Sequence, residues 1–138
     1  ILTIVPPING APLTIERILG VVFSPLAWTL GVDWAESSKA GYLLGVKLML
    51  TEFIAFIELG KIPVGEMTER TRMIMTYALC GFANVGSVGI TVSGMGILMP
   101  ERRNEIIGLV WKALLAGFLA TCMTAAVVGA MPRELFGL

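Results

Sequence analysis

The chain is 138 residues long, with 56% hydrophobic residues, 14% charged residues, and ten basic and ten acidic side chains that cancel at pH 7. Ordinary globular domains are about 25% charged, so this composition, with a mean hydropathy of +0.84, predicts an integral membrane protein. The absence of histidine, the presence of only two cysteines and the lack of long charge blocks argue against metal sites, disulfide scaffolds and nucleic-acid binding.

Residues 1–39 are predicted to contain the end of a preceding helix and then an interfacial or kinked helix. Three prolines and the Asn9-Gly10 turn signal interrupt the first stretch. Thr14 is placed to cap the second helix, and Pro25 would kink it. The chain starts at Ile1 rather than at methionine, so we expect a fragment of a longer protein.

Residues 40–62 are predicted to form a re-entrant helical hairpin. The segment is mostly apolar, but Lys47, Glu52 and Glu58 interrupt it, and a charge at the bilayer centre costs about 2.5 kcal/mol or more. A hairpin with its tip near residues 50–52 would place Glu52 in a cavity lined by protein. The alternative is a single span in which Lys47 and Glu52 face the helix bundle.

Residues 70–99 are predicted to form a broken transmembrane helix. The 27 residues from 73 to 99 carry no charge, and five of them are glycines. Because each glycine costs about 1 kcal/mol relative to alanine inside a helix, we expect an interruption between Gly81 and Gly89, with Asn84 and Ser87 at the break. Irregular backbone at membrane depth is tolerated only where it is buried in protein or lines a cavity, as in the midplane sites of transporters.

Residues 106–131 are predicted to form one full transmembrane helix. Nineteen uncharged residues follow Lys112 in this segment. Small side chains recur in it three and four residues apart, which favours close packing on another helix. These small residues are Ala113, Ala116, Gly117, Ala120, Thr121 and Thr124.

Four residues could carry chemistry within these apolar segments. Glu52 could accept hydrogen bonds from a polar solute, relay a proton or pair with Lys47. Asn84 and Ser87 lie three residues apart, so they would either face the same cavity or hydrogen-bond a neighbouring helix. The residues alone favour packing for Phe82. The chain has no nucleophile elbow, paired intramembrane aspartates or phosphate-binding glycine loop, so we predict that it is not an enzyme.

Several motifs occur in one consistent order along nearly the whole chain. They are GVKLMLTEFIAF at 45–56, CGFAN at 80–84 followed by Ser87, and PERR at 100–103. Together they resemble the C-terminal part of concentrative nucleoside transporters. In that family the residues corresponding to Glu52, Asn84 and Ser87 contact the ribose, and the one corresponding to Phe82 packs on the nucleoside. Thr51 departs from the family's usual asparagine at the hairpin.

The resemblance implies that residues 1–138 form the C-terminal transport-domain part, one half of an inverted-repeat, all-α transporter. It implies a multi-pass protein of the plasma or inner membrane that imports a uridine-like nucleoside, coupled to sodium in preference to a proton. A homotrimer and an elevator-like movement are also implied. Because the base-contacting hairpin and the cation site belong to the missing N-terminal repeat, this chain would supply the ribose-binding half of the site.

Three other functions remain as alternatives to a transporter. A passive channel or pore subunit would use the same break to line its pathway, and a non-transporting membrane scaffold would bind no solute. A membrane enzyme would use Glu52 as a base, but the partners that such chemistry needs are missing from the sequence. Uptake that depends on a cation gradient would exclude the channel.

Overall fold

The computed structural model describes residues 15–132 and 134, and within that part of the chain the fold is entirely helical. This confirms the predicted all-α class. The elements, in chain order, are α1 (Ile15–Thr29), α2 (Trp34–Met49), α3 (Glu52–Lys61), α4 (Glu69–Leu79), α5 (Val85–Leu98), the short 3-10 helix η1 (Pro100–Arg102) and α6 (Arg103–Ala130). The predicted Thr14 cap and the loop before it lie outside the described residues.

Helices α2 and α3 form a hairpin with a two-residue turn, Leu50 and Thr51. Thr51 caps α3, since its Oγ1 accepts a hydrogen bond from the Ile54 N–H at 3.3 Å. The turn therefore lies within the predicted tip. Helix α2 begins at Trp34, earlier than the predicted start at residue 40, because its first turn, which carries Glu36, packs against the start of α4.

Helix α1 lies across α2, and the two axes differ by 115°. The crossing depends on glycine, because a Cβ atom at Gly41 would lie 2.6 Å from the Gly20 carbonyl oxygen. Helix α1 continues through Pro25 without interruption. The Ser24 hydroxyl donates a hydrogen bond to the Gly20 carbonyl in the turn before this proline. Gly20 and Gly41 thus allow α1 to pack closely against α2 of the hairpin.

The second half of the chain contains the interrupted helix. Helix α4 ends at Leu79 and α5 begins at Val85, so the break covers residues 80–84. We expected an interruption between Gly81 and Gly89, but Gly86 and Gly89 are helical. The reason is local: the Asn84 Oδ1 accepts a hydrogen bond from the Ser87 N–H at 2.8 Å and so caps α5.

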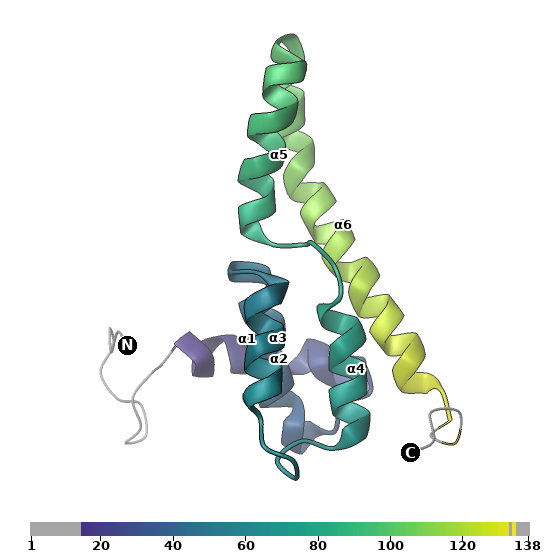
Figure 1. The fold of residues 1–138 in the computed structure, drawn as a ribbon. Helices are drawn as coiled ribbons and strands as arrows, with labels where there is room; N and C mark the ends of the chain where they lie inside the picture. The colour runs from purple at the N-terminus through teal and green to yellow at the C-terminus, as the bar shows by residue number, and fades with distance from the viewer. Residues whose placement is uncertain (1–14, 133, 135–138) are drawn as a thin grey trace.

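Helix α6 is 28 residues long and joins two regions of the molecule (Figure 1). We call α5, η1 and residues 103–117 of α6 the arm. We call α1 to α4 and residues 118–130 of α6 the helical base. In Figure 1 the arm rises above the base, and the chain passes from one to the other at the break.

The buried face of α6 consists mainly of large side chains such as Val110, Leu114 and Phe118. The predicted stripe of small residues is therefore not the main packing face within this chain. Two of its members nevertheless contact the break. A Cβ atom at Gly117 would lie 3.7 Å from Ala83 Cβ, and one at Gly81 would lie 2.5 Å from Thr121 Cγ2.

Among the described residues, one helical segment is long and apolar enough to cross a membrane, the 31 residues Pro100–Ala130. The bent pair formed by α1 and α2 passes the same test if it is counted as one span. Helix α6 overlaps the segment 106–131, for which the sequence predicts a full transmembrane helix, and it starts earlier, at Arg103.

Candidate functional site

The turn of the hairpin and the end of the break meet through one side-chain hydrogen bond. Glu52 is the first residue of α3, and Asn84 immediately precedes α5. The Asn84 Nδ2 donates a hydrogen bond to the Glu52 Oε2 at 3.1 Å. Asn84 is only 5% exposed, whereas Glu52 is half-buried. The structure therefore joins two of the predicted site residues across 32 positions of sequence.

Ser87 belongs to the same cluster. Its backbone N–H donates to the Asn84 Oδ1, and its hydroxyl donates to the Asn84 backbone carbonyl at 2.6 Å. Both groups are thus engaged in the first turn of α5. The hydroxyl oxygen retains its capacity to accept a hydrogen bond, because a serine hydroxyl is both a donor and an acceptor.

Two helix N-termini converge at this cluster, since both α3 and α5 begin there. Each N-terminus carries a partial positive charge, which stabilises the Glu52 carboxylate between them. Among the described residues, the Glu52 Oε1 and one Asn84 amide hydrogen have no hydrogen-bond partner. The cluster therefore offers a charged acceptor beside an amide donor, a pairing suited to a solute that carries hydroxyl groups.

Phe82 lies near the cluster but is not part of it. Its side chain is 84% exposed. It lines a groove of about 430 Å³ between α5 and α6, together with Ser87 and with Ala83, Val88, Thr91, Val110, Ala113, Leu114 and Gly117. Glu52 does not line this groove. The structure thus brings Glu52, Asn84 and Ser87 together and connects Phe82 to them only through the groove that Ser87 also lines.

Lys47 contradicts one alternative reading of the sequence, in which it pairs with Glu52. Its side chain is fully buried, and its Nζ donates to the Ala78 carbonyl oxygen and to the Thr121 Oγ1, both at 2.7 Å. The ion pairs among the described residues do not include it. Sequence reasoning missed this contact because Thr121 is 74 residues away. The only signal was a lysine inside an apolar segment.

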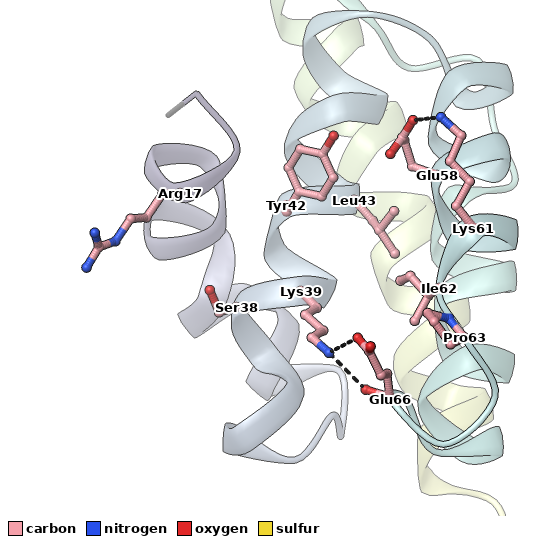
Figure 2. Close-up of a pocket in the computed structure, with 10 residues that line it drawn as sticks. All are labelled: Arg17, Ser38, Lys39, Tyr42, Leu43, Glu58, Lys61, Ile62, Pro63 and Glu66. Atoms are coloured by element: carbon pink, nitrogen blue, oxygen red, sulfur yellow. Dashed lines mark hydrogen bonds and ion pairs between the residues drawn. The ribbon is translucent and has the colours of Figure 1, made fainter. Parts of the chain in front are cut away.

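A second cavity, of about 510 Å³, lies between α1, the hairpin and the loop that follows α3 (Figure 2). Its wall carries two ion pairs, Lys39 with Glu66 at 2.8 Å and Lys61 with Glu58 at 2.7 Å. None of the four predicted site residues lines it. Because its acidic groups are already paired with lysines, it offers no obvious counterpart to the cluster around Glu52.

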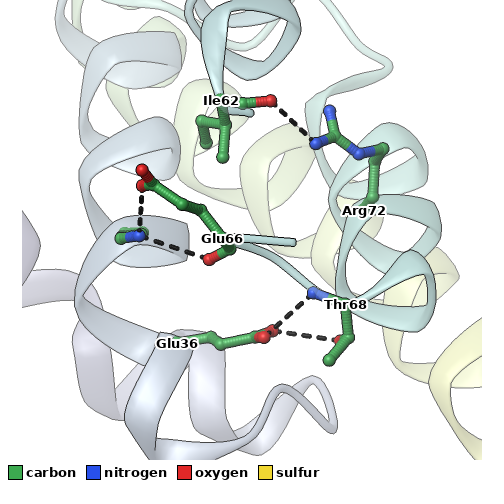
Figure 3. Close-up of polar contacts among 6 residues, drawn as sticks. Glu36, Ile62, Glu66, Thr68 and Arg72 are labelled. Atoms are coloured by element: carbon green, nitrogen blue, oxygen red, sulfur yellow. Dashed lines mark hydrogen bonds and ion pairs between the residues drawn. The ribbon is translucent and has the colours of Figure 1, made fainter. Parts of the chain in front are cut away.

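Polar side chains hold α4 in place at the base of the hairpin (Figure 3). The Glu36 carboxylate accepts hydrogen bonds from the Thr68 N–H at 2.9 Å and from the Thr68 hydroxyl at 3.1 Å. The Arg72 guanidinium donates to the Leu59 and Ile62 carbonyl oxygens, both at 3.0 Å. These contacts satisfy polar groups at the end of α3 and at the start of α4. They also fix the direction in which α4 leads to the break.

Over residues 15–132 and 134, no three histidine, cysteine, aspartate or glutamate residues come together in a way that could hold a metal ion. The cluster consists of the hydrogen-bonding groups of Glu52, Asn84 and Ser87, and the Phe82 ring lies beside it in the groove that Ser87 also lines. The expectation that the coupling cation binds outside this chain stays a prediction.

Comparison with known proteins identifies the family. Residues 1–129 match the family model described as "Na+ dependent nucleoside transporter C-terminus". The match covers nearly the whole chain and confirms the resemblance noted from the motifs.

Curated relatives from bacteria and mammals agree with this match. The chain is 46% identical to an uncharacterized transporter, YutK, of Bacillus subtilis and 39% identical to the nucleoside permease NupC of Helicobacter pylori, in each case over 85% of this chain and 29% of the relative. It is 34% identical to the sodium/nucleoside cotransporter 1 of Mus musculus, over 85% of this chain and 20% of that protein. These relatives are transporters and permeases, which agrees with the prediction that the chain is not an enzyme. The chain spans three tenths or less of their length.

Solved structures support the same family assignment. CNTnw in an inward-facing, substrate-bound state superposes with a TM-score of 0.79 at 41% identity, over 85% of this chain and 29% of that one. A CNTnw variant in an intermediate state gives a TM-score of 0.81 at 42% identity, over 88% and 30% of the two chains. The chain thus belongs to the sodium-dependent nucleoside transporters, a family of integral membrane proteins, and corresponds to their C-terminal part.

Proposed function

We propose that this chain supplies the ribose-binding half of the substrate site in a cation-coupled nucleoside importer. The observation that carries the proposal is the hydrogen bond between Asn84 and Glu52, which places a carboxylate and an amide side by side where two helices begin. A ribose presents neighbouring hydroxyl groups that both donate and accept hydrogen bonds. The free capacity of these two side chains matches that chemistry.

Each of the four residues has a distinct role in this proposal. Glu52 accepts hydrogen bonds from ribose hydroxyls, while Asn84 and Ser87 complete the contacts to the sugar. Phe82 supplies an apolar surface for the nucleoside, which is consistent with its high exposure beside the groove. Because a site built for hydroxyl groups leaves its own polar atoms unpaired with an analogue that lacks them, deoxyribonucleosides should be poor competitors.

The remaining parts of the transporter are proposed to lie in the missing N-terminal repeat. These are the hairpin that contacts the base and the site for the coupling cation. Sodium is favoured over a proton because one relative is named as a sodium/nucleoside cotransporter and the matching family model is described as Na+ dependent. The re-entrant position of the hairpin, the homotrimer and the elevator-like movement are proposed on the same family resemblance.

The direct test is uptake of labelled uridine into proteoliposomes that contain the complete protein, with and without a sodium gradient. We expect saturable uptake that collapses when the gradient is removed. Uptake that does not saturate and does not depend on a cation gradient would instead indicate a passive pore. Uptake that is driven by a proton gradient alone would retain the importer and reject sodium.

The Glu52→Gln variant of the complete protein tests the assignment of the site. We expect the KM for uridine to rise about tenfold or more, because the variant loses a charged hydrogen-bond acceptor. Glu58→Gln is the matched control, since Glu58 lies on the same helix but pairs with Lys61 away from the cluster. Near-normal uptake by Glu52→Gln would exclude Glu52 as the ribose acceptor.

A further inference from the structure

Lys47 is a fully buried cation that belongs to none of the close ion pairs among the described residues, although the more distant Glu52 carboxylate attracts its charge. Its two hydrogen bonds, to the Ala78 carbonyl oxygen and the Thr121 hydroxyl, are both 2.7 Å long. Burying a charge away from water is costly unless its surroundings compensate for it. A lysine at this place therefore needs an explanation beyond the filling of space.

The first compensation comes from the end of α4. Ala78 is the second-last residue of that helix, and the break that follows removes the normal partner of its carbonyl group. The ammonium group of Lys47 satisfies this oxygen and complements the partial negative charge of the helix C-terminus. The Phe118 ring, with its centroid 5.6 Å from Nζ, adds a cation–π contact.

The second compensation for the buried charge is the hydrogen bond from Lys47 to Thr121 of α6. The Thr121 Oγ1 accepts from Lys47 and donates to the Phe118 carbonyl oxygen at 2.8 Å, so the hydroxyl is used in both directions. Gly81 lies directly against Thr121, because a Cβ atom at that glycine would lie only 2.5 Å from the threonine methyl group. The start of the break is thus held between the hairpin and α6.

We propose that Lys47 is a positioning residue for the nucleoside site, which it serves by holding the start of the break so that Asn84 at its end meets Glu52. The hairpin then contacts the interrupted helix at both ends of the break, through Lys47 and Ala78 just before it and through Glu52 and Asn84 at its last residue. This inference rests on the proposed nucleoside function. It assigns Lys47 no direct contact with the substrate.

The Lys47→Met variant of the complete protein tests the proposal, because methionine keeps most of the length of the side chain and removes its charge. We expect the KM for uridine to rise about tenfold, while the maximal rate per inserted transporter changes less than about threefold. Lys61→Met is the control, since Lys61 lies on the same hairpin but is exposed and should give wild-type kinetics. An unchanged KM with a lower maximal rate would reduce Lys47 to a purely structural role.

A double-mutant cycle with Glu52→Gln shows whether Lys47 acts through the cluster. If it does, adding Lys47→Met to Glu52→Gln should raise the KM less than about threefold further, since the contact that it positions is already lost. Two independent effects would multiply in full. That result would contradict the proposal.

Variants of Thr121 test the same proposal without changing Lys47. Thr121→Val removes the acceptor for Lys47 but keeps the shape of the side chain, and we expect a smaller rise in KM, about threefold. Thr121→Ser keeps the hydroxyl and should bring the KM back toward the wild-type value. If the valine and serine variants behave alike, the hydrogen bond to Lys47 does not position the site.

Hydrogen–deuterium exchange of the complete protein separates this inference from the proposed function, because it does not depend on the substrate. In Lys47→Met we expect faster exchange of the backbone amides of residues 80–88 and unchanged exchange in α1. Equal exchange at residues 80–88 in the variant and the wild type would overturn the inference even if uridine is transported. If the wild type does not transport uridine, faster exchange there would still support the positioning of the break.

Discussion

The helical base and the arm are held by different kinds of interaction. In the base, charged side chains reach across the fold to the ends of other helices: Glu36 to Thr68, Lys47 to Ala78, Arg70 to Gly129, and Arg72 to Leu59 and Ile62. In the arm, the charged pair is Arg102 with Glu105, which is local in sequence and exposed. Ile90, Ile97 and Leu98 of the arm are 76 to 81% exposed on this chain.

This difference indicates which region depends on surroundings outside the chain. In the base, charged side chains satisfy carbonyl groups near the ends of α3, α4 and α6 from within the chain, which suits a membrane environment. The arm has no such long-range contacts made by charged side chains among the described residues, and like Phe53 and Val64 of the base it presents exposed apolar side chains, the surface expected where a helix faces lipid or the rest of a transporter. The candidate site lies where the two regions meet, since Asn84 precedes the arm and Glu52 belongs to the base.

The largest effect should come from emptying the core of the base. Leu43 is fully buried, so Leu43→Ala should lower the free energy of unfolding by about 2–5 kcal/mol. The measurement is a denaturant titration of the purified complete protein in micelles. The matched change in the arm is Ile97→Ala, which should alter stability by less than about 0.5 kcal/mol because Ile97 is 81% exposed. A comparable loss at Ile97 would show that the rest of the protein covers the arm.

A smaller effect should follow from releasing one helix end in the base. Arg72→Met removes the hydrogen bonds to the carbonyl groups of Leu59, near the end of α3, and of Ile62, just after it, and should cost about 1.5–3 kcal/mol in the same titration. Arg102→Met in the arm breaks only an exposed pair and should cost less than about 1 kcal/mol. Equal losses at the two arginines would remove the distinction between the long-range contacts of the base and the local pair of the arm.

The smallest effect should be a gain in the arm. A Cβ atom at Gly89 of α5 would have no neighbour within 4 Å, so Gly89→Ala should stabilise the protein by about 0.5–1 kcal/mol through higher helix propensity. The same change at Gly41 in the base should have the opposite sign, because its new Cβ atom would collide with the Gly20 carbonyl oxygen. Destabilisation by Gly89→Ala would mean that another part of the transporter packs closely on α5.

The sequence predicted the hairpin and the broken helix that bring Glu52 and Asn84 together, whereas the role of these residues in binding stays a prediction from the family resemblance. Polar residues in apolar segments need partners, which is why the sequence indicated a hairpin around Glu52 and a helix break at Asn84 and Ser87. The turn at Leu50 and Thr51 falls within the predicted tip. The break ends earlier than predicted, because the cap formed by Asn84 decides where α5 begins, whereas glycine count alone suggested a longer interruption.

The missed features depend on contacts between distant segments. The spacing of Lys47 and Glu52 suggested a possible pair, but the fold turns the lysine toward α4 and α6 instead. The small residues of α6 suggested a packing stripe. In the structure, Gly117 and Thr121 lie against Ala83 and Gly81 of the break, which their spacing alone did not predict. Neither arrangement follows from periodicity, since each is set by which helix lies opposite.

The amide group of Asn84 makes two contacts, one within its own helix start and one with the hairpin. Its oxygen fixes the first turn of α5, and its nitrogen reaches the hairpin. Because a planar amide turns as one piece, no rotation of this side chain can release Glu52 without also loosening the start of α5. A change in the Asn84 side chain that breaks its contact with Glu52 therefore also removes the N-terminal cap of α5.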